Sequence, residues 1–117
     1  MAVAQVGSEL FGANLPTVSE IEKLAFYVNS SEKLLLDFAK AVDAQLQKGE
    51  NLTGGIGAYI VGRINQAIEN LEKAKDSQHK SFFLAYALRK ARRYDEALAY
   101  LDKARSQQGD PQKVALE

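Results

Sequence analysis

Residues 82–104, with the sequence FFLAYALRKARRYDEALAYLDKA, constrain the fold of this chain more than any other segment. They predict two helices joined by a short basic turn at Arg92 and Arg93. The first helix is expected from about Gln78 to Ala91 and is apolar on nearly all of its faces, so it must lie between neighbouring helices to be buried. The second is expected from about Tyr94 to Gln107. This hairpin has too much apolar surface to stand alone, which predicts an all-α domain around it.

Three further helices are expected before this hairpin. Apolar residues recur at helical spacing in residues 17–28, from about Ser31 to Lys48, and from about Ile56 to Lys75. Thr17 followed by Glu20 forms a capping box, the pattern that opens many helices. The GENLTGG sequence at residues 49–55 is expected to be a loop. The predicted fold is therefore all-α, with about five antiparallel helices arranged as hairpins.

The length of 117 residues is typical of a single domain. Residues 1–16 mix glycine, asparagine and proline with scattered apolar residues, and they are expected to form an N-terminal arm. Residues 17–109 are expected to form the helical domain. Residues 110–117 are expected to be the start of a further helix or a tail.

An internal similarity links two of the predicted helices. The sequence INQAIENLEKAK at residues 64–75 aligns with YDEALAYLDKAR at residues 94–105. Alanine, leucine, lysine and alanine recur at four matched positions, where small alanines permit close helix packing and leucines fill the space between. Similarity of this kind at a fixed spacing is typical of helical repeat proteins.

The second of these segments, with the helix before it, resembles the tetratricopeptide repeat family. In that family an apolar first helix is followed by a short turn, a second helix opened by a phrase such as Tyr-Asp-Glu-Ala, and a proline. The two internal copies are 30 residues apart, against roughly 34 in the family. The resemblance is carried by Leu84, Ala85 and Leu88 in the first helix, by Tyr94, Ala97, Leu101 and Ala104 in the second, and by Pro111. The alternative is an ordinary helical bundle that contains a similar phrase.

The resemblance implies a non-enzymatic protein–protein interaction module that binds a peptide or acts as a scaffold. Its partner would be a protein or peptide, bound on a concave face formed by the first helices of the hairpins. The expected partner-binding residues are Asp37, Lys40, Tyr86, Arg89 and Lys90. The alternative function is a structural helical bundle that self-associates as a homo-oligomer.

The densest charge run is formed by Arg89, Lys90, Arg92 and Arg93. One interpretation is a site for an acidic peptide, a C-terminal carboxylate or a phosphate. The other is a solvated helix end whose cations complement the helix dipole. The second interpretation is favoured by the position of the run at the predicted turn.

Several classes of function are disfavoured by composition. The 15 basic and 15 acidic residues balance, whereas a nucleic-acid-binding protein usually carries a basic excess. There is no cysteine, and the single histidine, His79, has no neighbouring ligands that would make a metal site. The TGGIG sequence at residues 53–57 lacks the Gly-Lys-Ser/Thr ending of a phosphate-binding loop. Neither an enzyme nor a cofactor-binding protein is expected.

The chain also has no predicted membrane segment. Its first residues lack the basic and apolar regions of a secretory signal. No apolar stretch approaches the roughly 18 residues that a membrane-spanning helix needs. A soluble cytoplasmic protein is therefore expected.

Overall fold

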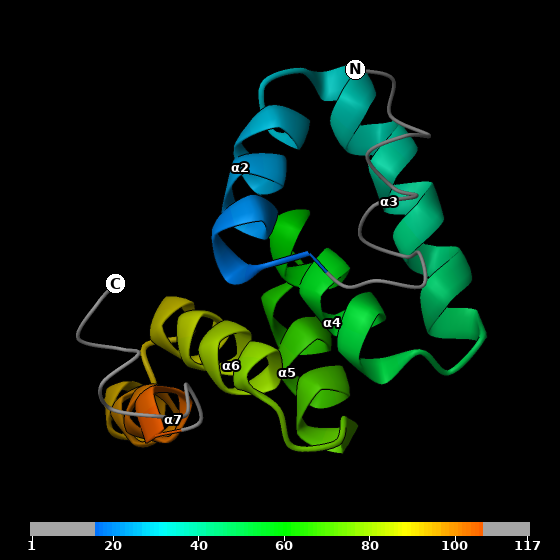
Figure 1. The fold of residues 1–117 in the computed structure, drawn as a ribbon. Helices are drawn as coiled ribbons and strands as arrows, with labels where there is room; N and C mark the ends of the chain where they lie inside the picture. The colour runs from blue at the N-terminus through cyan, green and yellow to red at the C-terminus, as the bar shows by residue number, and fades with distance from the viewer. Residues whose placement is uncertain (1–15, 107–117) are drawn as a thin grey trace.

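A computed structural model describes residues 16–106 and places them in six helices (Figure 1). These are α2 (Val18–Val28), α3 (Glu32–Gln47), α4 (Asn51–Ile60), α5 (Ile64–Lys73), α6 (Gln78–Lys90) and α7 (Tyr94–Ser106). No strand occurs in this part of the chain, so the predicted all-α class is confirmed. The predicted arm at residues 1–16 and the predicted tail at 110–117 lie outside the described residues, except for Pro16. None of the described helices is long and apolar enough to cross a membrane.

The predicted capping box opens α2. The Thr17 hydroxyl accepts a hydrogen bond from the Glu20 backbone N–H at 3.1 Å, and the Glu20 carboxylate accepts one from the Thr17 N–H at 2.9 Å. The hydrogen bond from the Thr17 backbone holds the pKa of Glu20 below its ordinary value. Two of the amides that have no partner inside the helix are thereby satisfied.

The predicted loop at residues 49–55 and the single helix predicted from Ile56 to Lys75 are wrong in detail. A helix already begins at Asn51, ends at Ile60, and is followed by a separate helix from Ile64. Glycine disfavours a helix by about 1 kcal/mol relative to alanine, but tertiary packing overrides that preference here. Gly55 is buried, and a Cβ atom on it would lie only 2.8 Å from Leu71 Cγ. The glycine therefore permits α4 and α5 to approach closely, rather than marking a loop.

Three helices end in the same way, at a residue with positive φ. These residues are Gly49 (φ 77°), Gly62 (φ 87°) and Arg92 (φ 63°). In each case the next backbone N–H donates to the carbonyl five residues earlier, as in a Schellman motif. The bond lengths are 3.1 Å after Gly49 and 2.9 Å after both Gly62 and Arg92.

The similarity of residues 64–75 to 94–105 therefore extends to whole hairpins. Gly62 and Arg92 hold matching positions in the two copies, and each ends the first helix of a hairpin with the same hydrogen bonds. The α4–α5 hairpin and the α6–α7 hairpin are thus two copies of one supersecondary unit. Only the first copy has glycine at the left-handed position.

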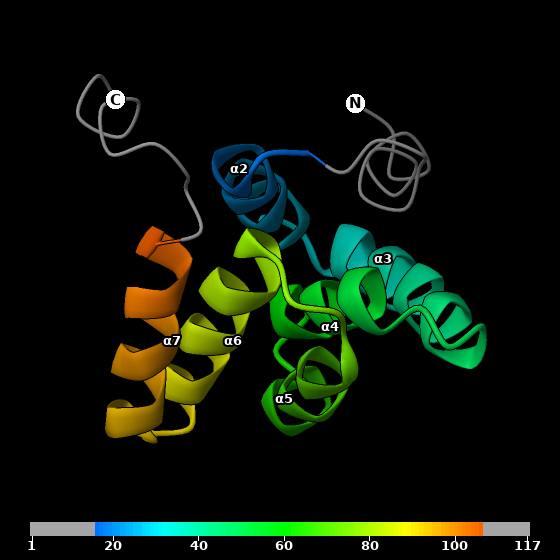
Figure 2. The ribbon, with the colours of Figure 1, turned by 60° about the horizontal axis from the view of Figure 1, so that its bottom comes forward.

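The hairpins pack side by side. In Figure 2, α6 lies between α7 and the α4–α5 hairpin, while α3 lies beyond α4. α6 contacts α7, α5 and α4, which confirms the prediction that this apolar helix is enclosed by neighbours. Phe83, Leu84 and Leu88 of α6 are at most 1 % exposed. They join one core with buried residues of the other helices, including Ile21, Phe38, Ile56 and Leu71.

A buried lysine connects the two hairpins. Lys80 is 8 % exposed, and its Nζ donates to the carbonyl oxygens of Ala74 at 2.9 Å and Glu72 at 3.3 Å. These carbonyls belong to the end of α5, which carries the negative pole of the helix. Asp76 accepts from Lys80 at 3.4 Å and pairs with Lys103 of α7 at 3.3 Å. The two lysines hold the pKa of Asp76 below its ordinary value, with the hydrogen bond from Lys103 as the larger cause.

Candidate functional site

The exposed stripe of α6 carries Tyr86 and Arg89, two of the residues predicted to bind a partner. Tyr86 is half-buried and Arg89 is exposed, one helical turn further on. The Arg89 guanidinium carbon lies 5.8 Å from the centre of the Tyr86 ring, within the range of a cation–π contact. We call this pair the Tyr86–Arg89 ridge, because a hollow lies on each side of it.

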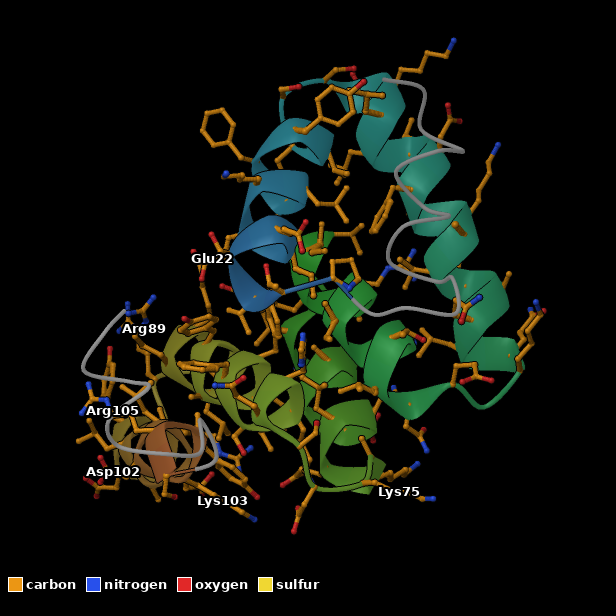
Figure 3. The ribbon with its side chains drawn as sticks, in the orientation of Figure 1. Glu22, Lys75, Arg89, Asp102, Lys103 and Arg105 are labelled. Atoms are coloured by element: carbon orange, nitrogen blue, oxygen red, sulfur yellow. The ribbon has the colours of Figure 1, made fainter. Side chains whose placement is uncertain are left out.

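The inner hollow lies between α2 and α6, with α4 contributing Tyr59. It has a volume of about 400 Å³. Figure 3 shows Glu22 on α2 and Arg89 on α6, on the facing sides of the two helices. The Tyr86 hydroxyl donates to the Glu22 carboxylate at 3.4 Å. The inner hollow is lined by Glu22, Ala25, Tyr59, Phe83, Tyr86 and Arg89.

Aromatic rings form one wall of the inner hollow. The Phe83 and Tyr86 rings are 5.8 Å apart and nearly perpendicular, and the Tyr59 and Phe83 rings are 6.0 Å apart. Offset and edge-to-face pairs at these distances are favourable. Phe82 is only half-buried whereas Phe83 is 1 % exposed, because adjacent side chains on a helix point in different directions. The wall is therefore preformed by packing.

Burial raises the pKa of both tyrosines of this wall above the ordinary value of 10.0. The Glu22 carboxylate raises the pKa of Tyr86 further, because it disfavours a second negative charge and accepts the phenol proton in a hydrogen bond. Both hydroxyls are therefore neutral at physiological pH. The inner hollow thus combines one carboxylate, one guanidinium and two neutral phenols.

The outer groove lies on the other side of the ridge, between α6 and α7. It has a volume of about 260 Å³. Leu98 is 60 % exposed and Tyr94 is 57 % exposed, although both are large apolar side chains. The outer groove is lined by Ala85, Tyr86, Arg89, Tyr94, Ala97, Leu98 and Leu101.

The other predicted binding residues lie elsewhere. Asp37 and Lys40 line a separate depression of about 540 Å³ on α3, beside the ion pair between Arg63 and Asp43. Lys90 is exposed at the end of α6 and lines neither the inner hollow nor the outer groove. The structure thus brings Tyr86 and Arg89 together but does not place Asp37 and Lys40 in the same hollow.

Of the residues that line these hollows, sequence reasoning predicted only Tyr86 and Arg89; the residues that it missed include Glu22, Tyr59, Tyr94 and Leu98. Tyr59 fell in a helix whose start was misplaced, and Glu22 is an ordinary polar residue of an amphipathic helix. Leu98 aligns in the sequence with Ile68, its counterpart in the first hairpin, which is only 4 % exposed. The sequence carried that comparison but gave no sign of the difference in burial.

No set of three or more histidine, aspartate or glutamate side chains in residues 16–106 is placed to hold a metal ion. His79 is partly buried, and its Nε2 lies 2.7 Å from the carbonyl oxygen of Pro16, so it connects the start of α6 to the residue that precedes α2. Asn29 makes a second connection, since its side-chain amide donates to the carbonyl oxygen of Ile60 at 3.0 Å. Both residues position α2, which forms one side of the inner hollow.

Comparison with protein-family models, with curated proteins and with solved structures gave no match to this chain.

Proposed function

We propose that this protein is a non-enzymatic interaction module that binds a peptide or protein partner across the Tyr86–Arg89 ridge. The observation that carries the proposal is the placement of this ridge. α6 is one of the most buried helices of the described chain, yet it places a half-buried aromatic ring and an exposed cation between two hollows. Together with tryptophan, tyrosine and arginine are the residue types most enriched among those that dominate binding energy at protein interfaces.

The tetratricopeptide-like part of the proposal comes from the sequence resemblance in residues 82–111. In that interpretation α4 and α6 are the first helices of two hairpins, and the partner lies along them. A cytoplasmic location and the exclusion of nucleic acid belong to the same proposal, and the balanced charge supports the exclusion of nucleic acid.

The inner hollow favours a partner that presents a carboxylate beside an apolar side chain. The Arg89 guanidinium can donate two parallel hydrogen bonds to a carboxylate, and hydrogen bonds to charged groups contribute about 1.5–3 kcal/mol. The neighbouring Tyr59 and Phe83 rings offer an apolar contact surface. Glu22 can accept a hydrogen bond from a backbone N–H of the bound segment, which would fix its direction.

The test is selection from a random peptide library, followed by calorimetric titration of the selected peptides. We expect Arg89→Glu to weaken their binding at least tenfold, because it replaces the cation with a like charge. Arg105→Glu is the matched control, since Arg105 is also exposed and lines neither the inner hollow nor the outer groove. Failure to select any peptide, or equal losses in the two variants, would reject the proposal.

A second candidate function is structural self-association. It is favoured by two large apolar side chains, Tyr94 and Leu98, which are more than half exposed and line the same groove. Exposed apolar clusters often mark contacts between subunits. Sedimentation equilibrium over a wide concentration range tests this function, and a monomer throughout would exclude it.

A further inference from the structure

Every residue that lines the outer groove has a counterpart in the first hairpin, at the same spacing that separates Gly62 from Arg92. Three of these counterparts lie on α4 and four on α5, just as the groove residues divide between α6 and α7. The groove is therefore the second copy of a surface that the first hairpin also possesses. The counterparts are Gly55, Ile56, Tyr59, Ile64, Ala67, Ile68 and Leu71.

In the first hairpin a helix covers this surface. α6 packs against both α4 and α5, and the Tyr59 ring contacts Phe83 of α6. Ile68 is 4 % exposed and Leu71 is fully buried. Figure 2 shows α6 running alongside the α4–α5 hairpin.

In the second hairpin two of the matched apolar positions face solvent. Leu98, the counterpart of Ile68, is 60 % exposed, and Tyr94, the counterpart of Ile64, is 57 % exposed. The turn that joins the two helices has the same hydrogen bonds in both copies. The α6–α7 hairpin thus presents, uncovered, the surface on which the α4–α5 hairpin holds a helix.

The charge of the hairpin indicates which kind of helix would fit. Residues 78–106 contain seven lysines and arginines against three aspartates and glutamates, in a chain that is neutral as a whole. Within residues 16–106, no acidic side chain forms an ion pair with Arg89, Lys90 or Arg92. These cations lie where α6 turns into α7, and Arg89 also lines the groove.

We propose that the outer groove binds an amphipathic helix with an acidic polar face, supplied by a partner protein, in the place that α6 occupies on the first hairpin. Leucine and aromatic side chains of that helix would cover Leu98 and Tyr94, and its carboxylates would face the three unpaired cations. The inference deepens the proposed function, because it rests on the assumption that the chain binds a protein partner. The proposed helix would bind in the outer groove and would not contact Glu22 or Tyr59, which line only the inner hollow.

Residues 108–117 of this chain are a poorer candidate for the occupant. A further step of the internal repeat aligns them with residues 78–87 of α6, but they place Lys113 where α6 has Phe83, and Gln112 where it has Phe82. Their single lysine and two acidic residues also give little negative charge. An acidic amphipathic helix from a partner would cover the apolar surface and would also pair with the cations.

The probe is a synthetic, end-capped peptide of 13 residues, the length of α6. It carries phenylalanine or leucine at the positions of Phe83, Leu84, Ala87 and Leu88, and mainly glutamate elsewhere. A second peptide replaces each glutamate with lysine and keeps the apolar residues. Fluorescence anisotropy with the full chain should show at least tenfold tighter binding of the acidic peptide, with the difference shrinking as salt is added.

The variants compare two leucines of nearly equal exposure. Leu98→Glu should weaken binding of the acidic peptide at least tenfold, whereas Leu36→Glu, at a leucine on α3 that is 57 % exposed, should change it less than twofold. Circular dichroism checks that both variants fold. Equal effects of the two substitutions, equal binding of the acidic and basic peptides, or no binding of either peptide would overturn the inference. Loss of a dimer in Leu98→Glu without peptide binding would also overturn it, and would assign the groove to a second copy.

Glu22→Lys separates this inference from the proposed function. It alters the inner hollow alone, so it should leave binding of the acidic helix within twofold of the original. Library peptides that depend on Glu22, together with a helix probe that fails to bind, would support the proposed function and reject the groove. A helix probe that depends on Leu98, together with an unproductive library, would support the groove and reject the ridge as a peptide site.

Discussion

Replacing Arg92 by glycine is expected to stabilise the protein. Arg92 has φ of 63°, in the left-handed region, and ends α6 in the position that Gly62 occupies at the end of α4. That conformation costs a residue with a Cβ roughly 1–2 kcal/mol. Glycine removes the strain, but it also makes the unfolded chain more flexible, which lowers the free energy of unfolding by about 0.4–1 kcal/mol. The net gain should be about 0.5–1 kcal/mol in the free energy of unfolding.

The assay is urea-induced unfolding followed by far-ultraviolet circular dichroism. Arg92 forms no ion pair with the other described residues, so the substitution removes little besides the strain. The converse change, Gly62→Ala, should cost about 1 kcal/mol, and purely through the backbone, because nothing lies within 4 Å of the added Cβ. Arg93→Gly is the matched control. It removes the neighbouring arginine, which has no positive φ and pairs with Glu96 at 2.6 Å, so it should not stabilise.

This reasoning would be refuted if Arg92→Gly left the free energy of unfolding unchanged or lowered it, while the slope of that free energy against urea concentration stayed the same. It would mean that the turn does not impose the left-handed conformation on residue 92. The two hairpin turns would then not be equivalent in energy. The assignment of the outer groove depends on that equivalence, so it would be weakened.

Two further substitutions test the packing of the hairpins by urea unfolding. Gly55→Ala should destabilise by up to about 2 kcal/mol, because overpacking costs about 1–3 kcal/mol and the gain in helix propensity offsets about 1 kcal/mol of it. The added methyl group would lie 2.8 Å from Leu71 Cγ and 3.2 Å from the Leu71 backbone nitrogen. Lys80→Met should cost about 1.5–3 kcal/mol, because the carbonyls at the end of α5 lose a buried charged donor. Lys103→Met, which breaks a more exposed ion pair, should cost at most about 1 kcal/mol and serves as its control.

Local patterns in the sequence predicted the class of the fold and several helix ends. The Thr17–Glu20 capping box forms, and the turn at Arg92 and Arg93 separates α6 from α7. These features depend on residues close together in the chain. The prediction failed at residues 51–63, where the role of each glycine depends on its partner. Gly55 packs against Leu71 inside a helix, whereas Gly62 ends one, and local sequence does not distinguish the two cases.

The candidate site was only partly predictable for a related reason. The sequence marked Tyr86 and Arg89 because they lie on the first helix of a recognisable hairpin. It also grouped them with Asp37 and Lys40 on the assumption that α3 is the first helix of a similar hairpin. In the structure α3 instead packs beside α4, and α4 is itself the first helix of the earlier hairpin. Because the start of one helix was misplaced, Asp37 and Lys40 were wrongly grouped with Tyr86 and Arg89.

The two hollows beside the ridge also differ in what creates them. The outer groove belongs to a single hairpin, so the internal repeat is enough to locate it and to show what its counterpart holds. The inner hollow needs α2, which lies outside the two repeated hairpins and is positioned by the hydrogen bonds of Asn29 to Ile60 and of His79 to Pro16. A repeat in the sequence therefore identifies matching positions for the outer groove, although not their exposure, and it identifies none for the α2 side of the inner hollow. If the protein binds two partners, the helix-binding groove should tolerate substitutions in α2 that abolish binding in the inner hollow.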